Sequence, residues 1–128
     1  MKRVTGIGGI FFKSADPAKL GAWYREHLGI PVEPWNGASF NWRYADQPER
    51  EGSTVWSTFP QEAKSFAPSK AQFMINYLVE NLEAVLEALR KEGVQVDERV
   101  EASEYGKFGW AMDPEGNRIE LWEPPSQA

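Results

Sequence analysis

Two spacings of hydrophobic residues alternate along this chain. Runs in which every second residue is hydrophobic are typical of strands, and they occur at residues 4–13, 39–44, 54–59, 72–79 and 94–100 and in both arms of residues 108–124. Spacings of three and four residues are typical of amphipathic helices, and they follow Asp16-Pro17 and Asn81, which are favoured at a helix start. The polar run 46–52 predicts a turn. The chain is therefore predicted to form a strand, a helix and about three strands, twice.

The second predicted helix repeats the hydrophobic positions of the first at a constant offset of 62 residues, which indicates an internal duplication. The corresponding positions are Leu20, Trp23, Tyr24 and His27 in the first helix and Leu82, Val85, Leu86 and Leu89 in the second. We therefore predict a single domain at residues 1–128, built from a module at 1–62 and a module at 68–125. Residues 61–70, which are mostly small or charged, are predicted to link the modules.

Residues 108–124, FGWAMDPEGNRIELWEP, predict a hairpin that closes the second module. Pro114 and Gly116 are turn residues, and the segments on either side alternate as strands do. Along the second arm, Arg118, Glu120 and Trp122 share one face. A carboxylate between an arginine and an indole is unusual on such a face. Glu120 is therefore the first candidate for a functional residue.

Three glycines interrupt the first predicted strand, at Gly6, Gly8 and Gly9. Glycine weakens a strand, so a cluster of this kind marks either a close approach by a ligand or another part of the chain, or a bulge. His27 is the only histidine, and its place on the hydrophobic stripe near the end of the first helix favours a packed or capping role over metal binding.

Composition excludes several classes of protein. The net charge of −5 argues against binding to nucleic acid, which needs a basic surface. No hydrophobic run approaches the roughly 20 residues of a membrane span, and the first residues do not resemble a signal peptide, so the cytoplasm is the expected location. The chain has no cysteine, which excludes disulfides and zinc sites built on sulfur. Six Trp, seven Phe and four Tyr exceed what a small core needs, so some of them are expected in a cavity or an interface.

The sequence resembles the vicinal oxygen chelate superfamily, which includes glyoxalase-type lyases, extradiol dioxygenases and bleomycin-resistance proteins. The resemblance is carried by GIGGIFF in the first strand, by DPAKLGAWYREHLGI and VENLEAVLEALRKEGV in the two helices, and by DPEGNRIELWEP in the closing hairpin. It implies an α+β fold in which two paired βαβββ modules form a curled mixed sheet around a cavity. It also implies a homodimer.

Members of this superfamily that use a metal hold it with four residues, commonly His and Glu, on strands of the two modules. Glu120 matches one of these positions. The others fall at Gly9, at about Met74 and within residues 54–59, where no carboxylate or imidazole is present. Since a metal site of this type needs about three protein donors, we expect no metal and no other cofactor.

The resemblance places a cavity between the modules. Besides Glu120, its expected ligand-binding residues are Gly9, Phe11, Met74, Asn76, Trp56, Trp110 and Trp122. The first hypothesis is a bleomycin-resistance-like protein that binds a flat or cationic small molecule in this aromatic, acidic cavity. The alternative is a lyase or isomerase of glyoxalase type, with or without a divalent metal, that uses Glu120 as a proton-transfer base. A third is an interaction protein whose duplicated fold serves dimerisation.

A purely structural interpretation of these residues also stays open. Glu120 would then pair with Arg118 or another arginine in a filled interior, and the tryptophans would be core residues.

Overall fold

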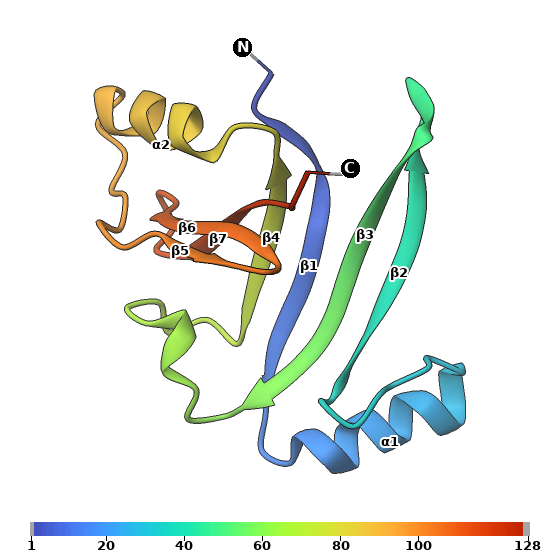
Figure 1. Cartoon of the computed structure of the whole chain (residues 1–128). Coiled ribbons are helices and arrows are strands. Elements are labelled where there is room, and N and C mark those ends of the chain that lie inside the picture. The colour runs from blue at the N-terminus through green and yellow to red at the C-terminus, as the bar shows by residue number, and fades with distance from the viewer. Residues whose placement is uncertain (1, 127–128) are drawn as a thin grey trace.

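The computed structural model describes residues 2–126. In chain order the elements are β1 (Val4–Ser14), α1 (Pro17–Leu28), β2 (Gly37–Tyr44), β3 (Gln47–Pro60), the short 3-10 helix η1 (Lys64–Phe66), β4 (Phe73–Val79), α2 (Leu82–Lys91), β5 (Glu101–Ser103), β6 (Gly106–Met112) and β7 (Arg118–Glu123). The strands form one curled sheet in the order β2-β3-β1-β4-β7-β6-β5, with α1 and α2 at opposite ends of the molecule (Figure 1). No helix within residues 2–126 is long and apolar enough to cross a membrane.

The two modules meet at the centre of the sheet, where β1 and β4 pair in antiparallel orientation. Outward from this pair the pattern is symmetric, because β3 is parallel to β1 on one side and β7 is parallel to β4 on the other. The expected α+β fold of two paired modules in a curled mixed sheet is confirmed. Two strands follow the helix in the first module and three follow it in the second, so β5 has no counterpart among the described residues of the first module.

The glycines of β1 lie at bulges. The pairing of β1 with β4 shifts register between Val4 and Gly6 and again between Ile7 and Gly9. Side chains of the protein come close to these glycines: Asn76 and Trp122 approach Gly8. Both interpretations of the glycine cluster therefore hold together, since a bulge is present and the groups that approach it belong to the chain itself.

The predicted turn at residues 46–52 is wrong, because the turn after β2 is short and most of this segment is strand. β3 begins at Gln47, and Arg43 pairs with Glu51 across the hairpin. The segment is polar because its side chains are largely exposed, and cross-strand backbone hydrogen bonds stabilise it despite its low strand propensity. This correction matters for function because the extended hairpin forms one wall of a cleft.

Helix α2 packs as predicted. Its capping residue Asn81 accepts a hydrogen bond from the backbone N–H of Ala84 at 3.1 Å. Leu82, Val85 and Leu86 are buried against β4 and β7, where they contact Val79 and Leu121 and form the main aliphatic core.

The stripe predicted for α1 is not buried. Asp16 caps the helix as expected, and Gly29 ends it in the left-handed conformation, but only Gly21 is fully buried along its length. His27 is exposed and lies 4.9 Å from the ring of Trp23, so the prediction that it is packed on a buried stripe is wrong. The reason is that α1 lies beyond one end of the sheet (Figure 1), where the ring of Tyr24 contacts Phe12 and Trp56.

Two segments between the regular elements also differ from the predictions. Residues 61–70 form more than a link, because Phe66 in η1 is 0% exposed and packs into the interior of the sheet. Residues 94–100 make only an isolated bridge, between Val96 and Ala111, where a strand was predicted. Asp97 continues this pairing through its backbone N–H, which donates to the carbonyl of Trp110 at 2.9 Å, and its carboxylate accepts a hydrogen bond from Arg118.

Candidate functional site

Glu120 lies on the inner face of β7, and two side chains from neighbouring strands donate hydrogen bonds to it. Its Oε1 accepts from Nδ2 of Asn76 on β4 at 2.6 Å, and its Oε2 accepts from Nε1 of Trp110 on β6 at 2.9 Å. The strand register explains this arrangement, because both Asn76 and Trp110 are directly opposite Glu120. Residues 76, 110 and 120 thus form a three-strand cluster that no local sequence pattern could show.

The surroundings of Glu120 favour its neutral form. Burial raises the pKa of the Glu120 carboxyl, while the hydrogen bonds from Asn76 and Trp110 and the charge of Arg118 act in the opposite direction. Arg118 does not pair with Glu120. Its guanidinium instead forms an ion pair with Asp97 at 3.2 Å and lies 5.2 Å from the ring centre of Trp110.

The interior beside Glu120 is filled by side chains. Phe11, Phe66, Met74 and Trp110 form one buried cluster, against which Phe59 and Phe108 also pack. Phe66 reaches this cluster from the segment between the modules. Asn76 is 1% exposed, and its Oδ1 has no hydrogen-bond partner. This part of the predicted cavity is therefore a packed core.

The structure separates the predicted ligand-binding residues into three groups. Gly9, Phe11, Met74, Asn76 and Trp110 surround the filled interior near Glu120. Trp56 lies on the other side of the sheet, where its ring contacts Phe12 and Tyr24 beside α1. Trp122 is the only one of these predicted residues that lines a second site, a cleft beside the β2–β3 hairpin.

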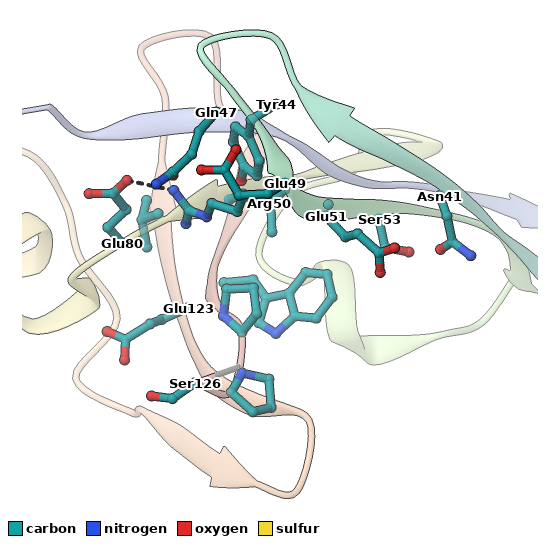
Figure 2. Close-up of a pocket in the computed structure, with 16 residues that line it drawn as sticks. Asn41, Tyr44, Gln47, Glu49, Arg50, Glu51, Ser53, Glu80, Glu123 and Ser126 are labelled. Atoms are coloured by element: carbon teal, nitrogen blue, oxygen red, sulfur yellow. Dashed lines mark hydrogen bonds and ion pairs between the residues drawn. The ribbon is translucent and has the colours of Figure 1, made fainter. Parts of the chain in front are cut away.

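This cleft, of about 670 Å³, lies between the outer half of the β2–β3 hairpin and the ends of β4 and β7 (Figure 2). Trp122 forms part of its lining and stacks on Phe108, with ring centres 5.7 Å apart and planes 6° from parallel. Because Trp122 follows Glu120 by two residues on β7, the cleft opens on the same face of the strand as Glu120.

The lining of the cleft is strongly acidic. It contains the carboxylates of Glu49, Glu51, Glu80 and Glu123, and Arg50 is the only cation among its lining residues within the described part of the chain. Three of these carboxylates are already engaged: Arg50 pairs with Glu80 at 2.8 Å, Arg43 pairs with Glu51 at 3.3 Å, and Glu123 accepts the backbone N–H of Leu82 at 2.9 Å. The cleft therefore presents aromatic surface together with excess negative charge.

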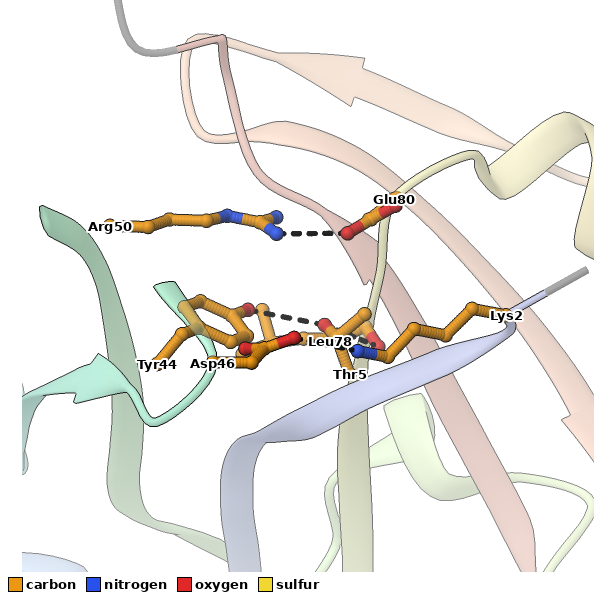
Figure 3. Close-up of polar contacts among 7 residues, drawn as sticks. All are labelled: Lys2, Thr5, Tyr44, Asp46, Arg50, Leu78 and Glu80. Atoms are coloured by element: carbon orange, nitrogen blue, oxygen red, sulfur yellow. Dashed lines mark hydrogen bonds and ion pairs between the residues drawn. The ribbon is translucent and has the colours of Figure 1, made fainter. Parts of the chain in front are cut away.

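Three contacts join the hairpin to neighbouring strands at this end of the sheet (Figure 3). The hydroxyls of Tyr44 and Thr5 are 3.1 Å apart, Lys2 and Asp46 are 3.5 Å apart, and Arg50 and Glu80 form the third contact. The sequence analysis did not predict this cleft or its lining residues. The one pattern that could have indicated them is the alternate spacing of four residues that all line the cleft, Gln47, Glu49, Glu51 and Ser53.

The residues around Glu120 do not fit a metal of the type that the superfamily commonly uses. Both carboxylate oxygens accept hydrogen bonds from N–H donors, and the neighbouring Asn76 turns its Nδ2, a donor, toward Glu120. Within residues 2–126, no three His, Cys, Asp or Glu side chains come together as metal ligands would. A single carboxylate does not hold a divalent ion in such a site.

The pKa of Glu120 leads to a prediction about stability and pH. Because its folded-state pKa is raised, Glu120 favours folding at low pH, and this contribution is lost as the pH rises through the folded-state pKa. We therefore expect Glu120→Gln to be more stable than the wild type at pH 7, with the difference closing toward pH 4. The new amide can keep the Trp110 hydrogen bond and donate to Oδ1 of Asn76 after rotation of the Asn76 amide, so that the number of hydrogen bonds at this site is unchanged.

Urea unfolding of both proteins at the two pH values measures this difference. Glu49→Gln, at an exposed position in the cleft, is the control for removal of a negative charge. The quantity compared is the free energy of unfolding of Glu120→Gln minus that of the wild type. If this difference is lower at pH 7 than at pH 4, the raised pKa of Glu120 is contradicted.

Comparisons with known proteins agree with this architecture. A model of the glyoxalase-like domain family matches residues 9–122. A search of curated proteins found no match. Among solved structures, the chain resembles the methylmalonyl-CoA epimerase of Streptomyces coelicolor in complex with 2-nitronate-propionyl-CoA, with a TM-score of 0.66 and 18% identity over 92% of this chain and 96% of the other.

Two further solved structures are similar. The methylmalonyl-CoA epimerase of Mycobacterium tuberculosis gives a TM-score of 0.61 at 19% identity, covering 98% of this chain and 92% of that one. A protein described as NAD-dependent benzaldehyde dehydrogenase from Legionella pneumophila gives 0.59 at 15% identity, covering 89% and 96%. At these identities the likeness establishes the fold alone.

Proposed function

Because this chain belongs to the glyoxalase-like domain family, and so to the vicinal oxygen chelate superfamily that its motifs resemble, we propose that it binds a small molecule without the usual metal. The site that we propose is the acidic cleft beside Trp122. This moves the expected ligand from the interior around Glu120 to the neighbouring end of the same sheet face. The single observation that carries the proposal is a cleft of about 670 Å³ that combines aromatic walls with carboxylates.

The charge of the cleft argues against a ligand like that of the similar epimerases. One of those structures contains a coenzyme A derivative, and coenzyme A carries several negatively charged phosphates. The cleft here has four glutamates and only one arginine among its described residues, so its excess negative charge would repel phosphates. A neutral or cationic compound with a flat apolar part suits the site better, as in the bleomycin-resistance-like function.

We expect Trp122→Leu to weaken binding of such a compound about tenfold, since the loss of a stacking surface costs roughly 1–1.5 kcal/mol. The measurement is isothermal titration calorimetry of the purified protein against a panel of neutral, cationic and anionic aromatic compounds. Calorimetry is preferable to fluorescence because the chain contains six tryptophans.

Trp23→Leu is the matched control, because Trp23 is half exposed on α1, which does not line the cleft. Its affinity should equal that of the wild type. If both variants bind equally well, the ligand does not occupy the cleft beside Trp122. If no compound in the panel binds the wild type, the proposed function itself fails.

The second candidate is proton transfer by Glu120 in a lyase or isomerase reaction. The observation in its favour is the raised pKa of a half-buried carboxyl, a property of general bases that act near neutral pH. Against it, Glu120 accepts two hydrogen bonds and does not line the cleft. An activity that survives Glu120→Gln would remove this candidate.

Three other expectations from the sequence stay proposals. Elemental analysis of the purified protein tests whether it is free of metal. Analytical ultracentrifugation tests the homodimer, which a monomer at micromolar concentration would contradict. Fractionation of the producing cells tests location in the cytoplasm.

A further inference from the structure

Arg50 occupies a place in the cleft that has the chemistry of a cation-binding subsite. Its guanidinium carbon lies 4.3 Å from the ring centre of Tyr44, and its Nη1 is 2.8 Å from Oε1 of Glu80 (Figures 2 and 3). An aromatic face next to a carboxylate is a common arrangement for binding guanidinium and ammonium groups, because the ring and the carboxylate both attract positive charge. Here the chain fills this arrangement with its own side chain.

We propose that the ligand of the cleft carries a guanidinium or ammonium group, which displaces Arg50 and lies between Tyr44 and Glu80. This inference rests on the proposed function, since it names the chemical class that the same cleft takes. Arg50 is then an internal competitor that lowers the affinity for weakly bound cations.

The aromatic wall of this subsite is fixed, whereas its present occupant is not. Tyr44 is buried, its hydroxyl lies 3.1 Å from that of Thr5, and its ring packs against Trp42 with ring centres 4.9 Å apart. Arg50 by contrast has a side chain that is 33% exposed, and Glu80 is the one acceptor of its hydrogen bonds within residues 2–126. Displacement of Arg50 therefore breaks one partly exposed ion pair and one contact with the Tyr44 ring, which together weaken ligand binding on the order of tenfold.

The charges around the subsite favour a cation over a neutral group. Once Arg50 turns out to solvent, Glu80 has no partner, and the other carboxylates of the lining leave the cleft without a positive charge among its described residues. A ligand cation restores both the contact with the Tyr44 ring and the charge balance. An anionic ligand would instead bind Arg50 in its present position, where the carboxylate of Glu80 already pairs with it.

The test uses agmatine, which carries a guanidinium and an ammonium group on a short chain, with binding measured by calorimetry. We expect Arg50→Gln to bind agmatine about tenfold more tightly than the wild type, because the internal competitor is gone. Arg43→Gln is the matched control. It removes the same charge from the same hairpin and likewise frees a lining carboxylate, because Arg43 pairs with Glu51, but Arg43 itself does not line the cleft and does not fill the site between Tyr44 and Glu80. Its affinity should stay within about twofold of the wild type.

A double variant, Arg50→Gln with Glu80→Gln, tests whether Glu80 binds the cation. It should lose the tighter agmatine binding that Arg50→Gln alone produces. Circular dichroism checks that each variant is folded. Equal gains in Arg50→Gln and Arg43→Gln would assign the effect to net charge and overturn the inference, as would unchanged or weaker binding by Arg50→Gln. If agmatine fails while another compound binds in a Trp122-dependent way, the inference falls and the proposed function stands. If nothing binds, both fall.

Discussion

Phe66→Ala is expected to lower the free energy of unfolding by about 3–4 kcal/mol, as large-to-small substitutions in a core do. Phe66 is 0% exposed, and its ring centre lies 5.4 Å from that of Phe59. It packs in one cluster with Met74 and Trp110, which belong to the second module. The alanine leaves a cavity between the modules beside Trp110, which donates a hydrogen bond to Glu120. Chemical denaturation monitored by circular dichroism measures the loss.

Phe40→Ala is a suitable control, because Phe40 is 44% exposed on β2 and should cost less than about 1 kcal/mol. A comparably small cost for Phe66→Ala would mean that the segment joining the modules is a passive link, as its sequence predicts. A large cost would show that this segment is part of the core.

Gly8→Ala is expected to lower the free energy of unfolding by about 1–3 kcal/mol, because the added methyl group has no space. At this position a Cβ atom would collide with Oδ1 of Asn76 and would lie 3.0 Å from Cε3 of Trp122 and 3.1 Å from Cγ of Leu78. Movement of the Asn76 amide away from the new methyl group disturbs the 2.6 Å hydrogen bond that this amide donates to Glu120. Thermal and urea unfolding measure the effect.

A double-mutant cycle assigns the cause of this effect. In an Asn76→Ala background the colliding amide is absent, so Gly8→Ala should cost less there than in the wild type. Equal costs in the two backgrounds would place the strain at Trp122 or Leu78 instead.

Much of the candidate site near Glu120 could be anticipated from the sequence. Alternation along β4 and β7 places Asn76 and Glu120 on one face of the sheet, and both are there. Their direct contact depends on the register between two strands that are far apart in the chain. The prediction of an open cavity at this point had no access to Phe66, because a phenylalanine in a polar segment carries no periodic signal.

The cleft was missed for a related reason. Residues 46–52 were interpreted as a turn because polar residues have low strand propensity, and only pairing with β2 makes most of them a strand. Likewise α1 has the spacing of a buried helix, yet its place at the end of the sheet leaves Trp23 and His27 exposed.

The pairing of the two halves in one α+β sheet was anticipated from the resemblance to the vicinal oxygen chelate superfamily. The sequence by itself determined the order of strands and helices, the closing hairpin and the face on which Glu120 lies. These features follow from local periodicity, because side-chain direction repeats every two residues in a strand and every 3.6 in a helix. Only the tertiary structure decided that Phe66 fills the interior, that Trp122 lines an acidic cleft, and that Arg50 lies between Tyr44 and Glu80. Each of these depends on contacts between residues far apart in the chain, which are set by strand pairing and packing and leave no pattern in any one segment.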